Sequence, residues 1–328
     1  MRMKKTLSLL LALLLSVSGA AIATETESAV ESAAEPATVW EPLPMDTVTI
    51  GPAPKDECYI SDTEYVDESI SVKIYSGRYA DTDYQYAHVK ISHPSQLRTA
   101  PAAIGGSRAN FHSTATRRGR LVAEDANAVI AINGDYYSKS ECTVVFRMGT
   151  QIRNQADGIR DLLIIDKNGD FAYLNAPQKK DYAEYVEAHQ DEMYQVFCFG
   201  PVLVENGKSV IAEDYRNNYI GAHKCAQRTA IMQLGQLEYV LVTSYGNQTK
   251  GNKGMTIYEF AAVCEQIGLE LNPEGGSRLA FNLDGGNSTT MCFKRLDEKT
   301  GRLDYVKVNC PEIERYLSDI VYFATLVK

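Results

Sequence analysis

The chain has 328 residues, 45% of them hydrophobic, and a formal net charge of −9 at pH 7. This length allows one large domain or two modest ones. Most of the negative charge lies in residues 24–69, which carry 12 acidic side chains and one lysine, so residues 70–328 have a net charge of only −1. The sequence therefore has no basic stripe of the kind that would indicate a nucleic acid partner.

Residues 1–23 have the pattern of a secretory signal peptide. A basic start precedes the apolar run of residues 7–17, and Ala21-Ile22-Ala23 matches a small-x-small cleavage signal. A membrane anchor is disfavoured because the apolar run is short for a bilayer span. We therefore expect a secreted, extracytoplasmic protein with no stable membrane insertion after signal removal.

Residues 24–69 are predicted to be an acidic, proline-containing linker. They contain five prolines and keep neither a helical nor a strand period for long. Residues 70–328 alternate strand signals with turns and are expected to form the folded domain. Its first strands are predicted at residues 69–77 and 85–92, which are rich in β-branched and aromatic residues.

Further along the chain, turn signals between apolar runs predict antiparallel hairpins. Three are expected: residues 161–174 around Asn168-Gly169, residues 200–211 around Asn206-Gly207, and residues 228–246 around Gly235.

Helical patterns are fewer. Residues 118–128 should form a helix that leads into a strand at 129–134, and residues 181–195 have helical composition. Residues 256–271 show apolar spacings of 3, 4 and 7, with Thr256 as a plausible N-cap and Gly268 as a C-cap. The predicted class is α+β, a strand-rich mixed sheet with several hairpins and a few covering helices.

Cysteine and histidine usage gives no metal or cofactor signal. The seven cysteines lack CxxC spacing, and no two of the five histidines stand at ligand spacing. An odd number of cysteines leaves at least one thiol unpaired, and most are expected to be small core residues. We therefore predict neither a metal site nor a cofactor.

Unusual polar stretches stand where predicted strands end. They are INGDYY (132–137), AQRTAIM (226–232), the loop 244–256 and NLDGGNSTTM (282–291). Taken singly, each is typical of an ordinary feature: a tight turn, a surface arginine, a flexible connector or a glycine-rich turn. The last one stands out, because a buried strand runs straight to Asp284 and two glycines follow it.

Taken together, and with CPEIERYLSDIVYF (310–323), these stretches resemble the phosphodiester glycosidase family over about residues 70–328. The resemblance implies a catalytic domain that cleaves the glycosidic bond of sugar-1-phosphodiesters, of N-acetylglucosamine-1-phosphodiester or cell-surface phosphoglycan type. The products would be a sugar and a phosphomonoester. The matching positions imply catalytic Asp284, Arg228 and Asn133, and substrate-binding Gly134, Thr229, Gly285, Gly286, Ser288 and Arg315.

The chemistry of these residue types agrees with such a substrate. An arginine fork, from Arg228 or secondarily Arg315, grips phosphate oxygens at two points. Glycines beside Asp284 would let backbone N–H groups approach a ligand. A phosphate monoester is a good leaving group, so a single carboxylate can suffice as nucleophile, base or stabiliser. Asp135 ranks well below Asp284 as a second carboxylate, because the family often has a small residue there.

Two other functions fit the same residues. A phosphodiesterase would attack phosphorus with the help of metal ions, but the stretch 166–170, which faintly resembles a calcium loop, reads better as a hairpin turn. A non-catalytic wall-glycan binding module would hold a sugar phosphate through Arg228 without breaking it. Binding alone does not need a strand-end carboxylate beside an anionic ligand, so Asp284 favours the hydrolase.

Overall fold

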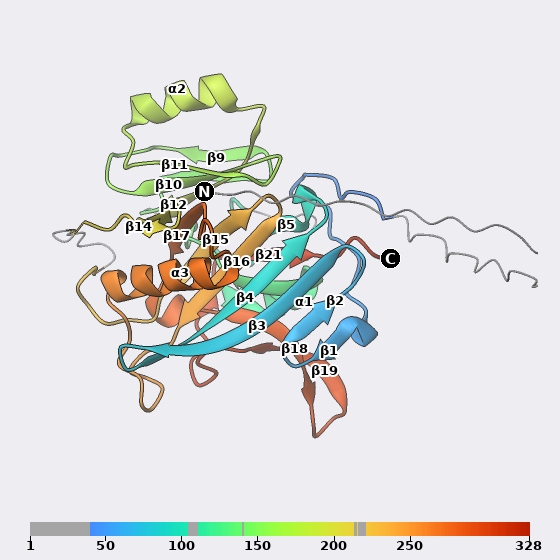
Figure 1. The fold of residues 1–328 in the computed structure, drawn as a ribbon. Coiled ribbons are helices and arrows are strands. Elements are labelled where there is room, and N and C mark those ends of the chain that lie inside the picture. Colours follow the sequence, from blue (N-terminus) through green and yellow to red (C-terminus); the bar gives the residue numbers. More distant parts are fainter. Residues whose placement is uncertain (1–39, 104–110, 140, 213–214, 216–220) are drawn as a thin grey trace, which may run out of the picture. The chain divides into compact units, whose positions relative to one another are not determined.

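The computed structural model describes residues 40–103, 111–139, 141–212, 215 and 221–328 (Figure 1). The predicted signal peptide lies outside them. Short 3-10 helices are η1 (Asp56–Cys58), η2 (Pro94–Gln96) and η3 (Gly286–Ser288). The α-helices are α1 (Gly119–Asp125), α2 (Lys179–His189) and α3 (Ile257–Leu271).

The strands form three large sheets and one small one. The nine-stranded sheet has the order β1 (Tyr59–Ser61), β2 (Glu64–Val66), β3 (Ile70–Tyr79), β4 (Thr82–Ile91), β16 (Glu238–Ser244), β15 (Thr229–Gly235), β17 (Leu279–Leu283), β13 (Val202–Glu205) and β14 (Lys208–Ser209). The β10 sheet runs β11 (Phe171–Leu174), β10 (Asp161–Asp166), β12 (Met193–Phe199), β8 (Val144–Arg147) and β9 (Thr150–Asn154). The β7 sheet runs β19 (Arg302–Lys307), β18 (Met291–Asp297), β7 (Ala128–Asn133), β21 (Asp319–Ala324) and β5 (Leu97–Pro101). A two-stranded sheet pairs β20 (Tyr316–Leu317) with β6 (Arg117–Arg118).

The predicted α+β class is confirmed, and so are all three hairpins, as β10–β11, β13–β14 and β15–β16. The sheet is not mixed as expected: throughout the described part of the chain every strand pair is antiparallel. Short hairpin loops allow antiparallel neighbours only, which explains the pairs of consecutive strands. The pairs between strands distant in the chain, such as β4–β16 and β7–β21, are antiparallel as well.

Helix α3 covers one face of the nine-stranded sheet (Figure 1). Its buried stripe includes Ile257, Phe260 and Ile267, which pack with Met232 and Ala280 of the sheet. Full burial of each large apolar side chain contributes about 1.5–3 kcal/mol. The alternate residues of the same strands face the other two large sheets, so β15 and β17 are covered on both faces.

Helix ends agree with the sequence in part. Thr256 is the N-cap of α3 as predicted, and its side chain accepts a hydrogen bond from the Glu259 N–H. The Gly268 C-cap is wrong: the helix continues to Leu271 and is capped by Asn272. Of the predicted helix 181–195, the first part is helical and the last residues belong to β12.

The predicted linker extends too far along the chain. Strands β1 and β2 lie within residues 24–69, and β2 pairs with β3 at the edge of the nine-stranded sheet. The guanidinium of the buried Arg98 also donates to the carbonyls of Pro44, Asp46 and Thr49 at 3.0, 3.0 and 2.9 Å. The folded part therefore begins well before residue 70. The sequence pattern missed strands β1 and β2 because they are short and lie at a sheet edge, where proline and acidic residues are tolerated.

Candidate functional site

Three strand ends from two sheets meet at one place. β7 ends at Asn133, β17 ends just before Asp284, and β21 begins at Asp319. The Asp284 N–H donates to the Gly134 carbonyl at 3.3 Å, and the Gly134 N–H donates to the Asp319 carbonyl at 3.4 Å. The structure thus brings the INGDYY and NLDGG stretches together.

Asn133 ties these strand ends to each other. Its amide Nδ2 donates to the carbonyls of Asp284 (2.7 Å) and Gly134 (3.1 Å). Its Oδ1 accepts from the Thr229 hydroxyl and from the Thr290 N–H, each at 3.0 Å. With Asn133 only 2% exposed, this side chain and that of Thr229 are used in holding the backbone around Asp284.

The glycines make room mainly for the protein itself. A Cβ on Gly134 would lie 2.5 Å from a carboxyl oxygen of Asp319, and one on Gly285 would lie 2.7 Å from the Gln227 carbonyl. A Cβ on Gly286 would meet nothing within 4 Å, but this residue has a φ of +59°, which glycine adopts most readily. Of these three glycines, only Gly286 therefore leaves open space of the kind expected beside Asp284.

Arg228 is not one of the residues that line the cavity next to Asp284. Its buried guanidinium donates to three main-chain carbonyls, Met255 (3.1 Å), Gly221 (3.1 Å) and Lys224 (2.8 Å). Burial lowers its pKa to about 10, so it stays charged at neutral pH. Arg228, our first candidate for binding phosphate, therefore connects two loops through their main-chain carbonyls.

Arg315, the second candidate, lies beside Asp284. Its Nη1 is 3.4 Å from the Ser288 hydroxyl and its Nη2 is 3.4 Å from the Tyr136 hydroxyl. The guanidinium carbon is 5.1 Å from the centre of the Tyr136 ring, within the range of a cation–π contact. Unlike Arg228, the residue is exposed, so its guanidinium can meet a ligand.

Asp284 forms part of the lining of a cavity of about 350 Å³. The other lining residues are Asp135, Tyr136, Lys139, Glu141, Cys142, Arg160 and Phe199. Two of them bring positive charge: the Lys139 ammonium is 5.3 Å from the Tyr136 ring centre, and the Arg160 guanidinium is 5.1 Å from the Phe199 ring centre. Three acidic residues, Asp135, Glu141 and Asp284, therefore share one cavity with two cations, Lys139 and Arg160.

The carboxyl of Asp284 binds its proton more tightly than usual. Burial raises its pKa to about 6, against the opposing effects of a hydrogen bond from Ser288 and the positive charge of Arg315. The nearby Asp135 carboxyl raises it further. A carboxyl that titrates near neutrality in a cavity is a common feature of catalytic sites.

The family model of phosphodiester glycosidases matches residues 126–324, which is more than half of the chain. The chain belongs to the phosphodiester glycosidase family. Membership of this family indicates a glycosidase-type hydrolase.

Solved structures are similar to this phosphodiester glycosidase, and the first named here, with a TM-score above 0.5, shares its fold. One is the zebrafish N-acetylglucosamine-1-phosphodiester alpha-N-acetylglucosaminidase catalytic domain, auto-inhibited by its pro-peptide, with 15% identity and a TM-score of 0.58 over 81% of this chain and 86% of that one. Another is a hypothetical protein from Synechocystis, with 16% identity and a TM-score of 0.47 over 78% of this chain and 62% of that one. No curated protein matches the sequence.

The sequence missed several lining residues of the phosphodiester glycosidase cavity. Tyr136 belongs to the INGDYY stretch that contributes to the family resemblance, and Lys139 lies three residues further along, but neither was singled out as a site residue. Tyr136 also has a φ of +64°, which is uncommon for a residue with a side chain and marks sites held under local strain. Arg160 immediately precedes strand β10, and no motif surrounds it.

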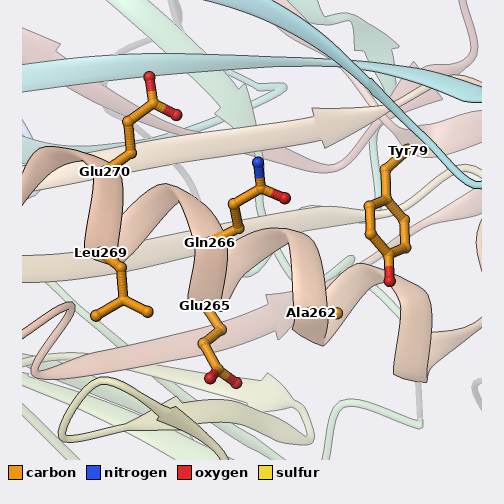
Figure 2. A pocket seen from close by; sticks show the side chains of 6 residues that line it. All are labelled: Tyr79, Ala262, Glu265, Gln266, Leu269 and Glu270. Atoms are coloured by element: carbon orange, nitrogen blue, oxygen red, sulfur yellow. The ribbon is translucent and has the colours of Figure 1, made fainter.

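A second, larger pocket of about 650 Å³ lies on the surface of α3 (Figure 2). Its lining residues are Tyr79, Ala262, Glu265, Gln266, Leu269 and Glu270. None of the site residues predicted from the sequence is among them, and no lysine or arginine of the described residues lines this pocket. We therefore take the cavity at Asp284 as the candidate site.

Metal-binding clusters and membrane-spanning helices are both absent from the residues that the structure describes. Within them, no group of three or more His, Cys, Asp or Glu side chains could hold a metal ion. Across the same residues, no helix has the length and apolar character of a membrane span. All seven cysteines are free, and five of them are buried, as expected of small core residues.

Proposed function

We propose that this phosphodiester glycosidase hydrolyses the glycosidic bond of sugar-1-phosphodiesters and releases a sugar and a phosphomonoester. The substrates would be of the N-acetylglucosamine-1-phosphodiester type or phosphoglycans of a cell surface. One observation carries the proposal: the titrating carboxyl of Asp284 shares a cavity with Lys139 and Arg160, and the exposed Arg315 lies beside it. A sugar phosphate needs a carboxyl at its reacting carbon and cations at its phosphate.

In the proposed reaction, the bond between the anomeric carbon and the phosphate oxygen breaks, and its electron pair leaves with the phosphate. A water oxygen bonds to the anomeric carbon, and Asp284 in its carboxylate form accepts the water proton. The same carboxylate stabilises the oxocarbenium-like transition state. Because the phosphomonoester is a good leaving group, no second carboxyl is required as an acid.

The phosphate is assigned to Arg315 in place of Arg228. The leaving phosphate gains negative charge as the bond breaks, and a guanidinium that faces it stabilises that charge. Arg315 is exposed and contacts Ser288, which in turn hydrogen-bonds the Asp284 carboxyl. Asn133 and Thr229 act by positioning Asp284, in place of the direct roles predicted from the sequence.

The place of action follows from the sequence pattern of residues 1–23, which supports export. We propose that the enzyme works outside the cytoplasm on a phosphodiester-linked glycan. Detection of the cleaved mature chain in the medium or envelope fraction of the producing cell would support this. A full-length chain confined to the cytosol would contradict it.

The deciding experiment is hydrolysis of sugar-1-phosphodiesters in heavy-oxygen water, with and without a chelator. A glycosidase places the label on the released sugar and leaves the phosphomonoester unlabelled. Label in the phosphate together with loss of activity on chelation would instead indicate a metal-dependent phosphodiesterase. Saturable substrate binding without turnover would indicate a glycan-binding module.

A further inference from the structure

A buried cluster of charged groups that the proposed reaction does not use lies beneath Asp284. It consists of Asp135, Arg147 and Asp319, whose side chains are at most 1% exposed. Arg147 Nη2 is 2.6 Å from Asp135 Oδ1 and 3.3 Å from Asp319 Oδ2. The guanidinium also lies over the Phe197 ring, 4.3 Å from its centre.

The charges in this cluster do not balance if both carboxyls are ionised. One guanidinium then faces two carboxylates, and a third carboxyl, Asp284, is close enough to affect Asp319 electrostatically. The groups around Asp319 are Arg147 of β8, Asp135 and Tyr137 from the segment after β7, Asp284 after β17, and the uncharged Pro101 of β5. Strand β12 contacts the other two members of the cluster, through the Cys198 N–H on Asp135 and the Phe197 ring on Arg147. A buried charge without compensation is costly, and a carboxyl in that position binds a proton instead.

Hydrogen bonding distinguishes the two carboxyls of the cluster. Both oxygens of Asp135 are satisfied, Oδ1 by Arg147 and Oδ2 by the Cys198 N–H at 2.8 Å. Asp319 makes the longer contact with Arg147, and its Oδ1 has no hydrogen-bond partner among the described residues. Asp135 therefore makes the closer ion pair with Arg147, and Asp319 has the carboxyl oxygen with room for a proton.

Asp319 also lies directly against the turn that supports the catalytic carboxyl. A Cβ on Gly134 would be 2.5 Å from Asp319 Oδ1, and the Gly134 carbonyl accepts the N–H of Asp284. The Asp319 carboxyl thus occupies the space under the Gly134 peptide. A change in its charge takes place just below the reaction centre.

We propose that Asp135 and Asp319 hold a single proton between them and that Asp319 carries it. Asp319 is then a positioning residue, because in its protonated form it adds no second buried negative charge next to Asp284. In support, burial raises the pKa of Asp319 to about 7; the positive charge of Arg147 opposes this shift and Asp135 adds to it. Loss of this proton above neutral pH would repel an anionic substrate.

The shared proton can be tested without any substrate. In the Asp284→Asn background, near neutral pH, the infrared spectrum should contain the C=O stretch of a protonated buried carboxyl. The band should disappear when Asp319→Asn is added. A spectrum without the band in the background variant, or one that keeps it after Asp319→Asn, would overturn the proposal.

Thermal stability offers a matched comparison of the two carboxyls. Asp319→Asn replaces a neutral group with a neutral isostere, so its Tm near neutral pH should stay close to that of the wild type. Asp135→Asn removes the ionised partner of a fully buried arginine, so its Tm should fall by many degrees or the variant should fail to fold. Equal effects of the two substitutions would contradict the assignment of the proton to Asp319.

The kinetic consequence rests on the proposed function, whereas the infrared and thermal results do not. In the wild type, KM for a phosphodiester substrate should rise above neutral pH by up to about tenfold, the effect of one pKa unit of interaction, with a smaller change in kcat. Asp319→Asn should remove this rise. An unchanged rise in the variant would contradict the positioning role, and complete absence of turnover would count against the proposed function alone.

Discussion

At the scale of single residues, the role proposed for Asp284 has consequences for both activity and stability. We predict that Asp284→Asn keeps the fold and abolishes turnover of sugar-1-phosphodiesters, because the amide preserves shape but cannot accept a proton or stabilise positive charge. In the wild type, kcat/KM should fall as the pH drops through about 6, where this carboxyl becomes protonated. Turnover by the variant at the wild-type rate would refute the assignment.

The same substitution should stabilise the protein at neutral pH. The pKa of Asp284 rises from an ordinary 3.8 to about 6 on folding, so the folded state binds the proton more tightly than the unfolded state. Stability is therefore lost as the pH rises between these values, by about 1–3 kcal/mol. Asp284→Asn should raise Tm at pH 7 and have little effect near pH 4. A lower Tm at pH 7 would indicate a structural role instead.

Arg315 and Arg228 can be separated by the same conservative change. Arg315→Lys keeps the charge but loses the two-point fork, so hydrolysis of phosphodiesters should suffer far more than that of simple aryl glycosides. Arg228→Lys should weaken three carbonyl contacts, lowering stability by about 1–3 kcal/mol and affecting both substrate types alike. If Arg228→Lys were the selective variant, the original ranking from the sequence would stand.

At the scale of elements, local chemistry explains most of what the sequence predicted correctly. Asn-Gly turns and a Thr256 cap depend on neighbours within a few residues, and the structure confirms them. Asp284 and Arg315 were predicted as residues of one site through the family resemblance. Lys139 and Arg160 were not found, because tertiary contacts bring them to Asp284. The partners of Arg228 are main-chain carbonyls of two loops, which no side-chain pattern encodes.

Gly268 shows how a local rule fails and gives a test of α3. The sequence suggested a helix end, but a Cβ there would lie 2.8 Å from the Ser277 backbone nitrogen. Alanine has the better helix propensity by about 1 kcal/mol, yet the clash should outweigh it. We predict that Gly268→Ala lowers the free energy of unfolding by about 1–3 kcal/mol in denaturant titrations. Gly235→Ala, whose nearest neighbour would be 3.8 Å away, is the control and should change it little.

At the scale of the whole molecule, the site depends on sheets that close around a shared core, and the residues before position 70 belong to that structure. Tyr59 and Tyr65 are buried in the core with Phe293 and Phe323. Their rings make edge contacts, Tyr59 with Tyr65 at 4.7 Å and with Phe293 at 5.1 Å between centres. Composition alone assigned this segment to a linker because it is acidic and rich in proline.

Truncation tests this correction. A chain that starts at residue 40 should unfold at nearly the same temperature as the mature protein. A chain that starts at residue 70 loses two buried tyrosines and leaves the guanidinium of Arg98 without the carbonyls of residues 44–49. Breaking the contacts of one buried charged group alone costs about 3–5 kcal/mol, a large part of the stability of a typical domain. The shorter chain should therefore show a much lower Tm or aggregate. Equal melting temperatures for the two chains would restore the linker boundary at residue 69.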